Sequence, residues 1–285
     1  MISATAKRSE LFTPFRYPGG KSALYRYFCG LLALNGMSRA TYVEPFAGGA
    51  GAALSLLFTE RVERVVINDL DPAMYAAWQA MTHDTAEFLE LVNAARLTVD
   101  EWQKHRETYL RGDLARPLEL GYAAFYLNRT SRSGVLTAGP IGGFDQTGNY
   151  KIDARFRKDS ISERLRQIRA YRNRIDVRNQ DGREFIKAHV DDRNTLIYVD
   201  PPYFVKGSRL YLNSFTEADH IDLATLLNAH ADSRWVLTYD DVPEVRSMFP
   251  ERRTDSLRLN YSLQRAGAAT ELIVFSDSLE LPVSP

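Results

Sequence analysis

The chain has 285 residues, of which 45% are hydrophobic and 25% are charged, and its formal net charge is zero. These values are typical of a globular protein with one large domain plus an insertion. A single cysteine, Cys29, excludes an internal disulfide framework and a cysteine-rich metal site, and it favours a cytoplasmic location. The sequence shows no signal-peptide pattern and no apolar run long enough to span a membrane, so we expect no membrane partner.

The charges are segregated along the chain. Residues 151–178 contain ten basic and four acidic residues, a net charge of +6, whereas residues 60–101 carry a net charge of −6. Segregated charge can create a basic, nucleic-acid-binding face on a neutral protein. A solvated helix face explains the same composition.

The first dense motif lies within residues 12–22 and contains Tyr17-Pro18-Gly19-Gly20-Lys21. The following serine invites comparison with a phosphate-binding loop, but that loop requires a glycine where this chain has Phe15. A diglycine followed by a lysine and an apolar helix can bring backbone N–H groups and one cation against a ligand carboxylate. A plain loop before a helix would explain the glycines but not the tyrosine and the lysine together.

Residues 41–46 predict a strand, residues 47–51 a glycine turn and residues 52–58 the start of a helix. This order opens a nucleotide-binding crossover, although the full glycine fingerprint is missing. A second predicted strand, residues 64–69, ends in Asp69, eighteen residues beyond Gly51. An acid at about this spacing, ~20 residues, binds the ribose hydroxyls of a nucleotide in such folds.

Residues 71–126 change to helical periodicity. The predicted helices are residues 72–81, 85–96, 99–110 and 117–127. A polar loop, residues 128–134, follows with an asparagine and two arginines, and a glycine-rich stretch then extends to about Tyr150. Such side chains donate to base edges and phosphates, so this is either a nucleic-acid-reading loop or a plain surface loop.

The rest of the chain returns to alternating strands and helices. The predicted strands are residues 175–179, 195–199, 234–240 and a terminal hairpin of 257–263 with 271–275, and the predicted helices are residues 183–189 and 216–230.

The strand 195–199 ends in Asp200-Pro201-Pro202-Tyr203. Two prolines stiffen the chain as it leaves the sheet, so it presents one carboxylate, backbone carbonyls and an aromatic ring. This edge is where open α/β sheets bind ligands, and the groups suit a planar molecule with an exocyclic amine. Taken alone, the motif also fits a simple turn that closes a strand.

In this order, the motifs resemble those of the Dam-type DNA adenine-N6 methyltransferases over nearly the whole chain. The resemblance rests on residues 17–21, 44–51, 68–69 and 200–203, and residues 127–129 and 213–215 are also similar. It implies an α/β fold with a seven-stranded, Rossmann-like S-adenosylmethionine-dependent methyltransferase sheet and a terminal antiparallel hairpin. Residues 1–71 and 175–285 would form the catalytic methyltransferase domain. Residues 72–174 would form a mostly helical, inserted target-recognition domain.

The resemblance also implies roles for individual residues. The cofactor-binding residues would be Tyr17, Gly19, Gly20, Lys21, Glu44, Phe46, Gly48, Gly49, Asp69, Asp181 and Asp200. Asp69 would hold the ribose of S-adenosylmethionine and Asp181 its adenine ring, although Gly182 stands where relatives often have an aromatic residue. The catalytic residues would be Asp200, Pro201, Pro202 and Tyr203.

The expected reaction is methylation of the adenine N6 amine in a specific sequence of double-stranded DNA. Asp200 and the Pro201 carbonyl would accept the two amine hydrogens and localise the lone pair toward the methyl donor, while Tyr203 stacks on the base. Because a base inside a duplex cannot reach such a pocket, we expect it to flip out. The five histidines show no ligand spacing, so we predict no metal.

Other functions fit parts of the pattern. Cytosine N4, an RNA adenine or a protein glutamine amide could present a similar nitrogen to the same tetrad. A non-catalytic nucleic-acid-binding relative would keep the fold, although the intact Lys21, Asp69 and Asp200 argue against it. A dinucleotide-dependent oxidoreductase would leave residues 200–203 unexplained. Restriction–modification with a nuclease partner and a regulatory role both fit such an enzyme.

The predicted DNA-binding residues are Asn128, Arg129, Arg132, Arg166, Arg169 and Arg172. Relatives that read GATC carry an aromatic residue a few positions after the asparagine–arginine pair, where this chain has Arg132 and Ser133. We therefore expect Arg129 and Arg132 to read bases in a target that is not simply GATC, and the other three arginines to contact phosphates.

Overall fold

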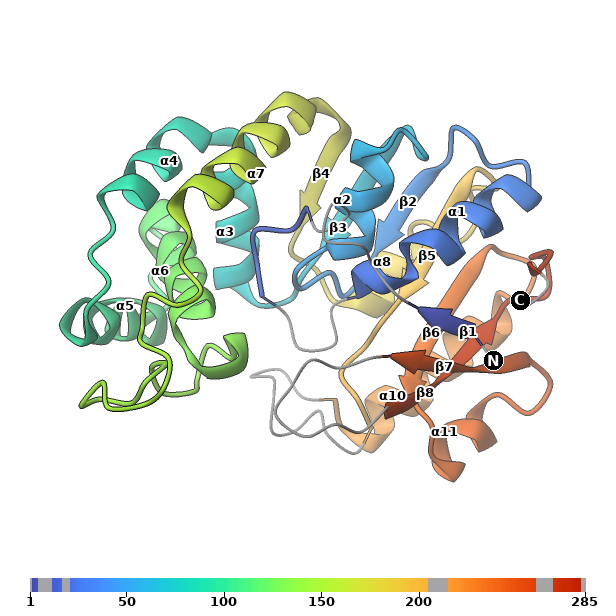
Figure 1. Cartoon of the computed structure of the whole chain (residues 1–285). Coiled ribbons are helices and arrows are strands. Elements are labelled where there is room, and N and C mark those ends of the chain that lie inside the picture. Colours follow the sequence, from blue (N-terminus) through green and yellow to red (C-terminus); the bar gives the residue numbers. More distant parts are fainter. Residues whose placement is uncertain (1, 5–11, 17–20, 205–214, 260–268, 283–285) are drawn as a thin grey trace.

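A computed structural model describes residues 2–4, 12–16, 21–204, 215–259 and 269–282. Within these residues, one eight-stranded sheet forms the centre of the molecule (Figure 1). The strands are β1 (Ile2–Ala4), β2 (Thr41–Glu44), β3 (Arg64–Asn68), β4 (Ile175–Arg178), β5 (Thr195–Val199), β6 (Trp235–Asp240), β7 (Arg253–Leu259) and β8 (Ala269–Phe275).

Helices cover both faces of the sheet. The α-helices are α1 (Tyr25–Leu34), α2 (Gly51–Phe58), α3 (Pro72–His83), α4 (Thr85–Ala94), α5 (Val99–Arg111), α6 (Pro117–Thr130), α7 (Lys158–Tyr171), α8 (Gly182–Lys187), α10 (Glu217–Ala229) and α11 (Pro243–Met248). Short 3₁₀ turns are η2 (Lys21–Leu24), η3 (Arg132–Gly134) and η4 (Arg172–Arg174).

The strand order is β1-β7-β8-β6-β5-β2-β3-β4, and only β8 runs antiparallel to its neighbours. From β2 the chain moves outward to β3 and β4, and it then crosses back to β5 on the other side of β2. The order therefore reverses between β2 and β5, which is where open α/β sheets bind ligands. The predicted Rossmann-like sheet and its antiparallel β7–β8 hairpin are confirmed. The turn of that hairpin lies outside the described residues.

Strand alternation separates two apolar cores. Tyr42 points toward the face covered by α1, α2, α3 and α7, whereas its neighbour Val43 points toward α8, α10 and α11. Because both faces are covered, the central strands are almost wholly apolar, which is the pattern that identified them in the sequence. The result is a three-layer sandwich. The helices cover the two faces of the sheet, and the candidate functional site forms at the carboxyl ends of its strands.

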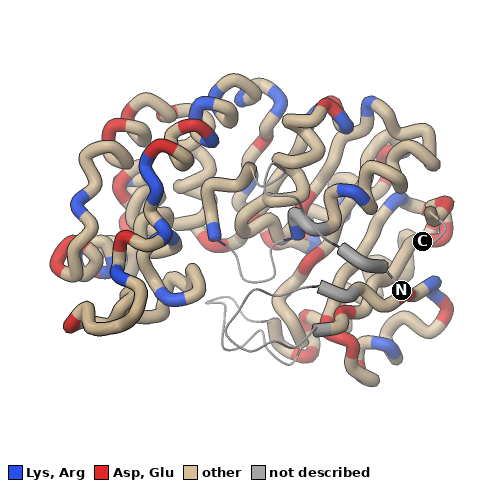
Figure 2. The backbone as a smooth tube through the Cα atoms, in the orientation of Figure 1, with Lys and Arg blue, Asp and Glu red and all other residues tan. Residues whose placement is uncertain are grey.

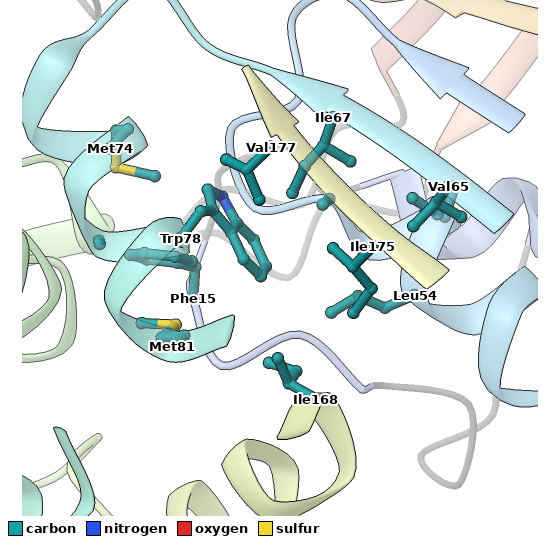
Figure 3. Packing of buried hydrophobic residues seen from close by; sticks show 14 of the residues in the cluster. Phe15, Leu54, Val65, Ile67, Met74, Trp78, Met81, Ile168, Ile175 and Val177 are labelled. Carbon is teal, nitrogen blue, oxygen red and sulfur yellow. The ribbon is translucent and has the colours of Figure 1, made fainter. Parts of the chain in front are cut away.

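The helical insertion shares the core of the sheet. Figure 3 shows Trp78 of α3 and Ile168 of α7 facing the Ile67, Ile175 and Val177 side chains of β3 and β4, and all belong to one buried cluster. The proposed boundary between residues 71 and 72 therefore crosses a continuous core. Helices α4, α5 and α6 project furthest from the sheet (Figure 1).

Three elements differ from the sequence-based expectation. Helix α7 was not predicted, because its many arginines hide the buried stripe of Ile161, Leu165 and Ile168. Helix α6 extends to Thr130, three residues into the predicted polar loop. Strand β1 is an eighth strand that was not predicted. It is only three residues long, and it pairs in parallel with β7.

Helix α6 approaches the backbone of α3 closely at Gly121. A Cβ atom at this position would lie 2.5 Å from the Ala77 backbone nitrogen and 2.7 Å from the Ala76 carbonyl oxygen. Backbone atoms cannot move aside as a flexible side chain can, so a larger residue would force the two helices apart. The glycine thus allows the close packing of α6 against α3, the helix of the insertion that covers the sheet.

We predict that Gly121→Ala lowers the free energy of unfolding by about 1–3 kcal/mol, the usual effect of overpacking. Urea denaturation followed by circular dichroism measures this change. The matched control is Gly30→Ala in α1, where the nearest atom to a new Cβ is 3.7 Å away. This control should be neutral or stabilising, because alanine favours a helix by up to ~1 kcal/mol over glycine. Equal effects of the two substitutions would contradict the packing argument.

Candidate active site

The carboxyl ends of β2, β3 and β4 are tied together by the buried amide of Asn68. Its Nδ2 donates to the Pro45 carbonyl at 2.9 Å and to the Gln180 carbonyl at 3.0 Å, and its Oδ1 accepts from the Gln180 N–H at 2.9 Å. One side chain thus satisfies backbone groups from two neighbouring loops. The sequence showed Asn68 beside Asp69 but gave no sign of this structural role.

The glycine turn between β2 and α2 is held from three sides. The Gly48 N–H donates to Asp69 Oδ2 at 3.0 Å, and Trp78 Nε1 donates to the Gly48 carbonyl at 2.9 Å. The Thr13 hydroxyl donates to the Gly49 carbonyl. Gly48 has a φ of 48°, a left-handed conformation that glycine adopts without strain. The predicted cofactor loop is therefore rigid and lies beside the predicted ribose carboxylate.

Asp69 retains acceptor capacity toward a ligand. Oδ2 accepts from Gly48 and Oδ1 accepts from the Asp71 N–H at 3.0 Å, so each oxygen has one backbone donor. A carboxylate oxygen can accept a second hydrogen bond, which two ribose hydroxyls could provide. Burial, together with the nearby Asp71 carboxylate, raises the pKa of Asp69 to about 7.

Asp181 is hydrogen-bonded to Arg183. Its carboxylate accepts from Arg183 Nε at 3.1 Å and Nη2 at 2.8 Å, and its Oδ1 also accepts the Arg183 backbone N–H at 2.8 Å. These bonds hold the pKa of Asp181 below its usual value. The bidentate pair occupies most of the carboxylate, so its proposed contact with an adenine ring has fewer free acceptor sites than Asp69 offers.

The structure explains why glycine follows Asp181. A Cβ at position 182 would lie 2.4 Å from the Phe46 ring, so any other residue here would require this ring to move. The Phe46 ring also packs edge-on against Phe215 with centroids 5.6 Å apart, and the Arg183 guanidinium lies 5.8 Å from the centre of the Phe215 ring. An aromatic surface is thus supplied by Phe46 and Phe215 instead of by residue 182. Phe215 was not predicted as a site residue.

At the end of β5, Asp200 belongs to a polar network with Lys21. Lys21 Nζ lies 3.2 Å from Asp200 Oδ1, and the Thr238 hydroxyl of β6 donates to the same oxygen at 2.8 Å. Burial raises the pKa of Asp200, and the Lys21 charge opposes this rise. Both of these donors contact Oδ1. Among the described residues, none forms a hydrogen bond with Oδ2, so this oxygen can accept one from another partner.

Glu271 of β8 completes this network. Lys21 Nζ donates to Glu271 Oε2 at 2.8 Å and to the Tyr203 hydroxyl at 3.0 Å, and that hydroxyl donates to Glu271 Oε1. Lys21 and Glu271 are 6% and 4% exposed, whereas Asp200 is 25% exposed. The predicted residues Lys21, Asp200 and Tyr203 therefore meet, with Asp200 as the outermost charge. Sequence analysis missed Glu271 and Thr238.

The structure describes only some of the remaining residues that the resemblance identified. Tyr17, Gly19 and Gly20 lie outside the described residues, as do positions 213 and 214. Glu44 is buried, and its Oε1 accepts the Ala53 N–H of α2 at 3.1 Å. Burial raises the pKa of Glu44 to about 8. It is thus a buried acid behind the glycine turn rather than an exposed ligand group.

Asn128 and Arg129 do not face solvent, contrary to the expectation that they contact DNA. Asn128 is fully buried, and its amide accepts the Arg16 N–H at 2.7 Å and donates to the Arg16 carbonyl at 2.8 Å. Arg129 is 9% exposed and donates to the Pro14 and Arg155 carbonyls. The continuation of α6 to Thr130 turns both side chains inward, where they hold the segment before the Tyr17–Lys21 motif.

The other predicted DNA contacts are exposed. Arg132 lies in the turn after α6, and Arg166, Arg169 and Arg172 lie along the outer side of α7 and its extension. Basic and acidic positions are interspersed over the backbone in Figure 2, so the overall charge distribution does not select a DNA-binding face. Specific arginines must be tested instead.

The chain belongs to the family of D12 class N6 adenine-specific DNA methyltransferases, whose pattern matches residues 17–261. An rRNA methyltransferase, AviRa from Streptomyces viridochromogenes, is similar in structure at 13% identity and a TM-score of 0.39, covering 96% of this chain and 90% of that one. None of the curated proteins matches. The family identifies an adenine-specific DNA methyltransferase, and such enzymes generally use S-adenosylmethionine.

No described helix is long and apolar enough to cross a bilayer. No group of three or more histidine, cysteine, aspartate or glutamate side chains that could hold a metal occurs among the described residues.

We predict that Glu44→Gln stabilises the protein at pH 8. The folded-state pKa of Glu44 is about 8 against an ordinary value of 4.5, so the folded protein retains a proton that the unfolded chain loses. This contribution to stability is complete below pH 4.5 and is lost as the pH rises through 8. Removing the titration should gain at least ~1 kcal/mol at pH 8.

Urea denaturation at several pH values measures this effect, with Glu87→Gln on the exposed side of α4 as the matched control. A substituted protein whose stability falls with pH as steeply as the wild type would show that Glu44 is already ionised in the folded state.

Proposed function

We propose that this enzyme transfers the methyl group of S-adenosylmethionine to the N6 amine of an adenine flipped out of a specific DNA duplex sequence. The proposal rests on the way in which the Asp200 carboxylate is hydrogen-bonded. Its Oδ1 is held by Lys21 and Thr238, which leaves Oδ2 as a fixed acceptor at the carboxyl end of β5. The family match supplies the reaction class.

The residues present fit S-adenosylmethionine. Asp69 can accept two ribose hydroxyls while its backbone bonds persist, and Phe46 and Phe215 offer an apolar surface for an adenine ring. Bound there, the cofactor would supply an electrophilic methyl group on a sulfonium. The Glu44, Gly48 and Gly49 positions would shape the pocket through the rigid turn, and Asp181 would contribute its remaining acceptor capacity.

Asp200 would act as a hydrogen-bond acceptor and not as a strong base. The N6 lone pair of adenine is delocalised into the ring, so the free amine is a weak nucleophile. Acceptance of one hydrogen by Asp200 Oδ2 and of the other by the Pro201 carbonyl would localise that lone pair. Pro202 would stiffen the turn, and the Tyr203 ring would stack on the base. Catalysis then depends on positioning and electrostatics.

Removal of the Asp200 carboxylate should abolish transfer and spare cofactor binding. We predict that Asp200→Ala lowers the single-turnover methylation rate by ~10²-fold or more, as loss of one preorganised polar group does in other enzymes. Calorimetry should show largely intact S-adenosylmethionine affinity, with at most a modest weakening, because the resemblance gives Asp200 some contact with the cofactor. The matched control is Asp191→Ala, an exposed acid before the opposite end of β5. More than a tenth of the wild-type rate in the Asp200 variant would refute the assigned role.

The exposed turn after α6 is the proposed base reader. We predict that Arg132→Ala changes the relative methylation rates among sites, because an arginine paired with guanine contributes ~1–3 kcal/mol of discrimination. Methylation-aware sequencing of unmethylated genomic DNA treated with each protein compares the sites. If both proteins methylate the same sites with the same relative rates, this turn does not read the sequence.

A further inference from the structure

Five arginines converge around the segment that precedes the Tyr17–Lys21 motif. We call them the arginine cluster, and its members are Arg16, Arg129, Arg155, Arg157 and Arg164. They come from separate parts of the chain, namely the segment 12–16, helix α6, the residues before α7, and α7 itself. Arg129 and Arg164 donate hydrogen bonds to this N-terminal segment, which contains Arg16 itself.

The hydrogen bonds of the cluster are made to backbone carbonyls. Arg164 Nη1 donates to the Thr13 carbonyl at 2.6 Å, Arg129 Nη1 to the Pro14 carbonyl at 3.4 Å, and Arg16 Nη1 to the Ser131 carbonyl at 3.4 Å. In the part of the chain that the structure describes, no carboxylate forms an ion pair within 4.0 Å of any of the five guanidinium groups. The described carboxylates therefore leave their charge without close compensation.

Arg129 is the most unusual member. It is nine-tenths buried, and its Nε has no hydrogen-bond partner among the described residues. Burial, together with the charges of the other four members of the cluster, lowers the pKa of Arg129 to about 9. A buried cation without a counter-ion is costly, and an anion bound beside it would offset that cost.

The cluster lies on the same side of the sheet as the active site. Thr13, held by Arg164, donates in turn to the Gly49 carbonyl of the glycine turn. Lys21 is five positions after Arg16, so their Cα atoms are at most ~18 Å apart. Lys21 itself contacts Asp200. An anion bound by the cluster would thus lie within a few nucleotides of a base that occupies the active site.

The arginines of the second half of α7 are placed differently. Arg172 begins the 3₁₀ turn η4, which leads directly into the amino end of β4. In a parallel sheet this edge is opposite the carboxyl ends where Asp200 lies. The strongly basic stretch 151–178 is therefore divided, and Arg155, Arg157 and Arg164 are its members on the active-site side.

We propose that the arginine cluster is a binding site for backbone phosphates of the nucleic-acid substrate, with Arg155 and Arg157 as its exposed contacts and Arg129 as the buried charge beneath. This assignment rests on the proposed function, because it takes DNA as the substrate. It replaces Arg129 as a base reader with Arg129 as part of a phosphate site. Guanidinium groups suit this ligand, since their planar N–H donors match phosphate oxygens.

The test uses the double variant Arg155→Ala/Arg157→Ala of the full chain and a short fluorescein-labelled DNA duplex. Both side chains are exposed and make no hydrogen bond within the described residues, so the fold should survive, which circular dichroism checks. Fluorescence anisotropy over a series of sodium chloride concentrations gives the affinity and its salt dependence. Arg193→Ala, an exposed arginine before the amino end of β5, is the matched control, and Arg157→Ala alone serves if the double variant misfolds.

We expect the double variant to bind at least about tenfold more weakly at low salt, with the slope of log K against log salt smaller by about 2, since each phosphate contact contributes ~0.9. The control should match the wild type. Affinity and slope equal to those of the wild type would overturn the proposal.

Methyl transfer from labelled S-adenosylmethionine to unmethylated duplex DNA by the wild type is measured in parallel. Transfer by the wild type together with unchanged binding by the double variant would refute the phosphate site alone. Binding that depends on the cluster without any transfer would refute the proposed function and leave the phosphate site standing.

Discussion

The candidate active site depends on one buried ammonium group shared by two carboxylates. Lys21 joins the N-terminal motif to Asp200 at the end of β5 and to Glu271 on β8. Loss of the Lys21 ammonium would leave both carboxylates without this cation, and removal of one partner from a buried ion pair costs ~3–5 kcal/mol.

The buried acidic residues at the strand ends that form this site lower the stability of the folded protein. Burial raises the pKa values of Glu44, Asp69 and Asp200, so the ionised form of each carboxyl group is less stable in the folded protein than in the unfolded chain. Two apolar cores on opposite faces of the sheet offset this cost. The Asn68 amide fixes the loops at which the acids emerge. The fold thus supports a cluster of acids at one edge that would not be stable alone.

Short sequence motifs predicted those elements whose structure depends on residues adjacent in the sequence. The apolar run 195–199, the glycine turn and the acid after β3 each form where the sequence places them. Glu271 and Thr238 could not be predicted as site residues, because the pairing of β5 with β6 and of β6 with β8 brings them to the Lys21–Asp200 pair from distant positions. Asn128 and Arg129 were wrongly predicted to lie on the surface. Their polar side chains suggest a surface loop, yet they bury to bond the backbone of residues 14–16.

The most direct test of the account is the identity of the product. The protein is incubated with S-adenosylmethionine and unmethylated genomic DNA, and the DNA is digested to nucleosides for mass spectrometry. The account predicts N6-methyladenine that increases with time and is confined to particular sequences when the same DNA is sequenced for methylation. N4-methylcytosine as the product, or methylation of RNA but not of DNA, would contradict it.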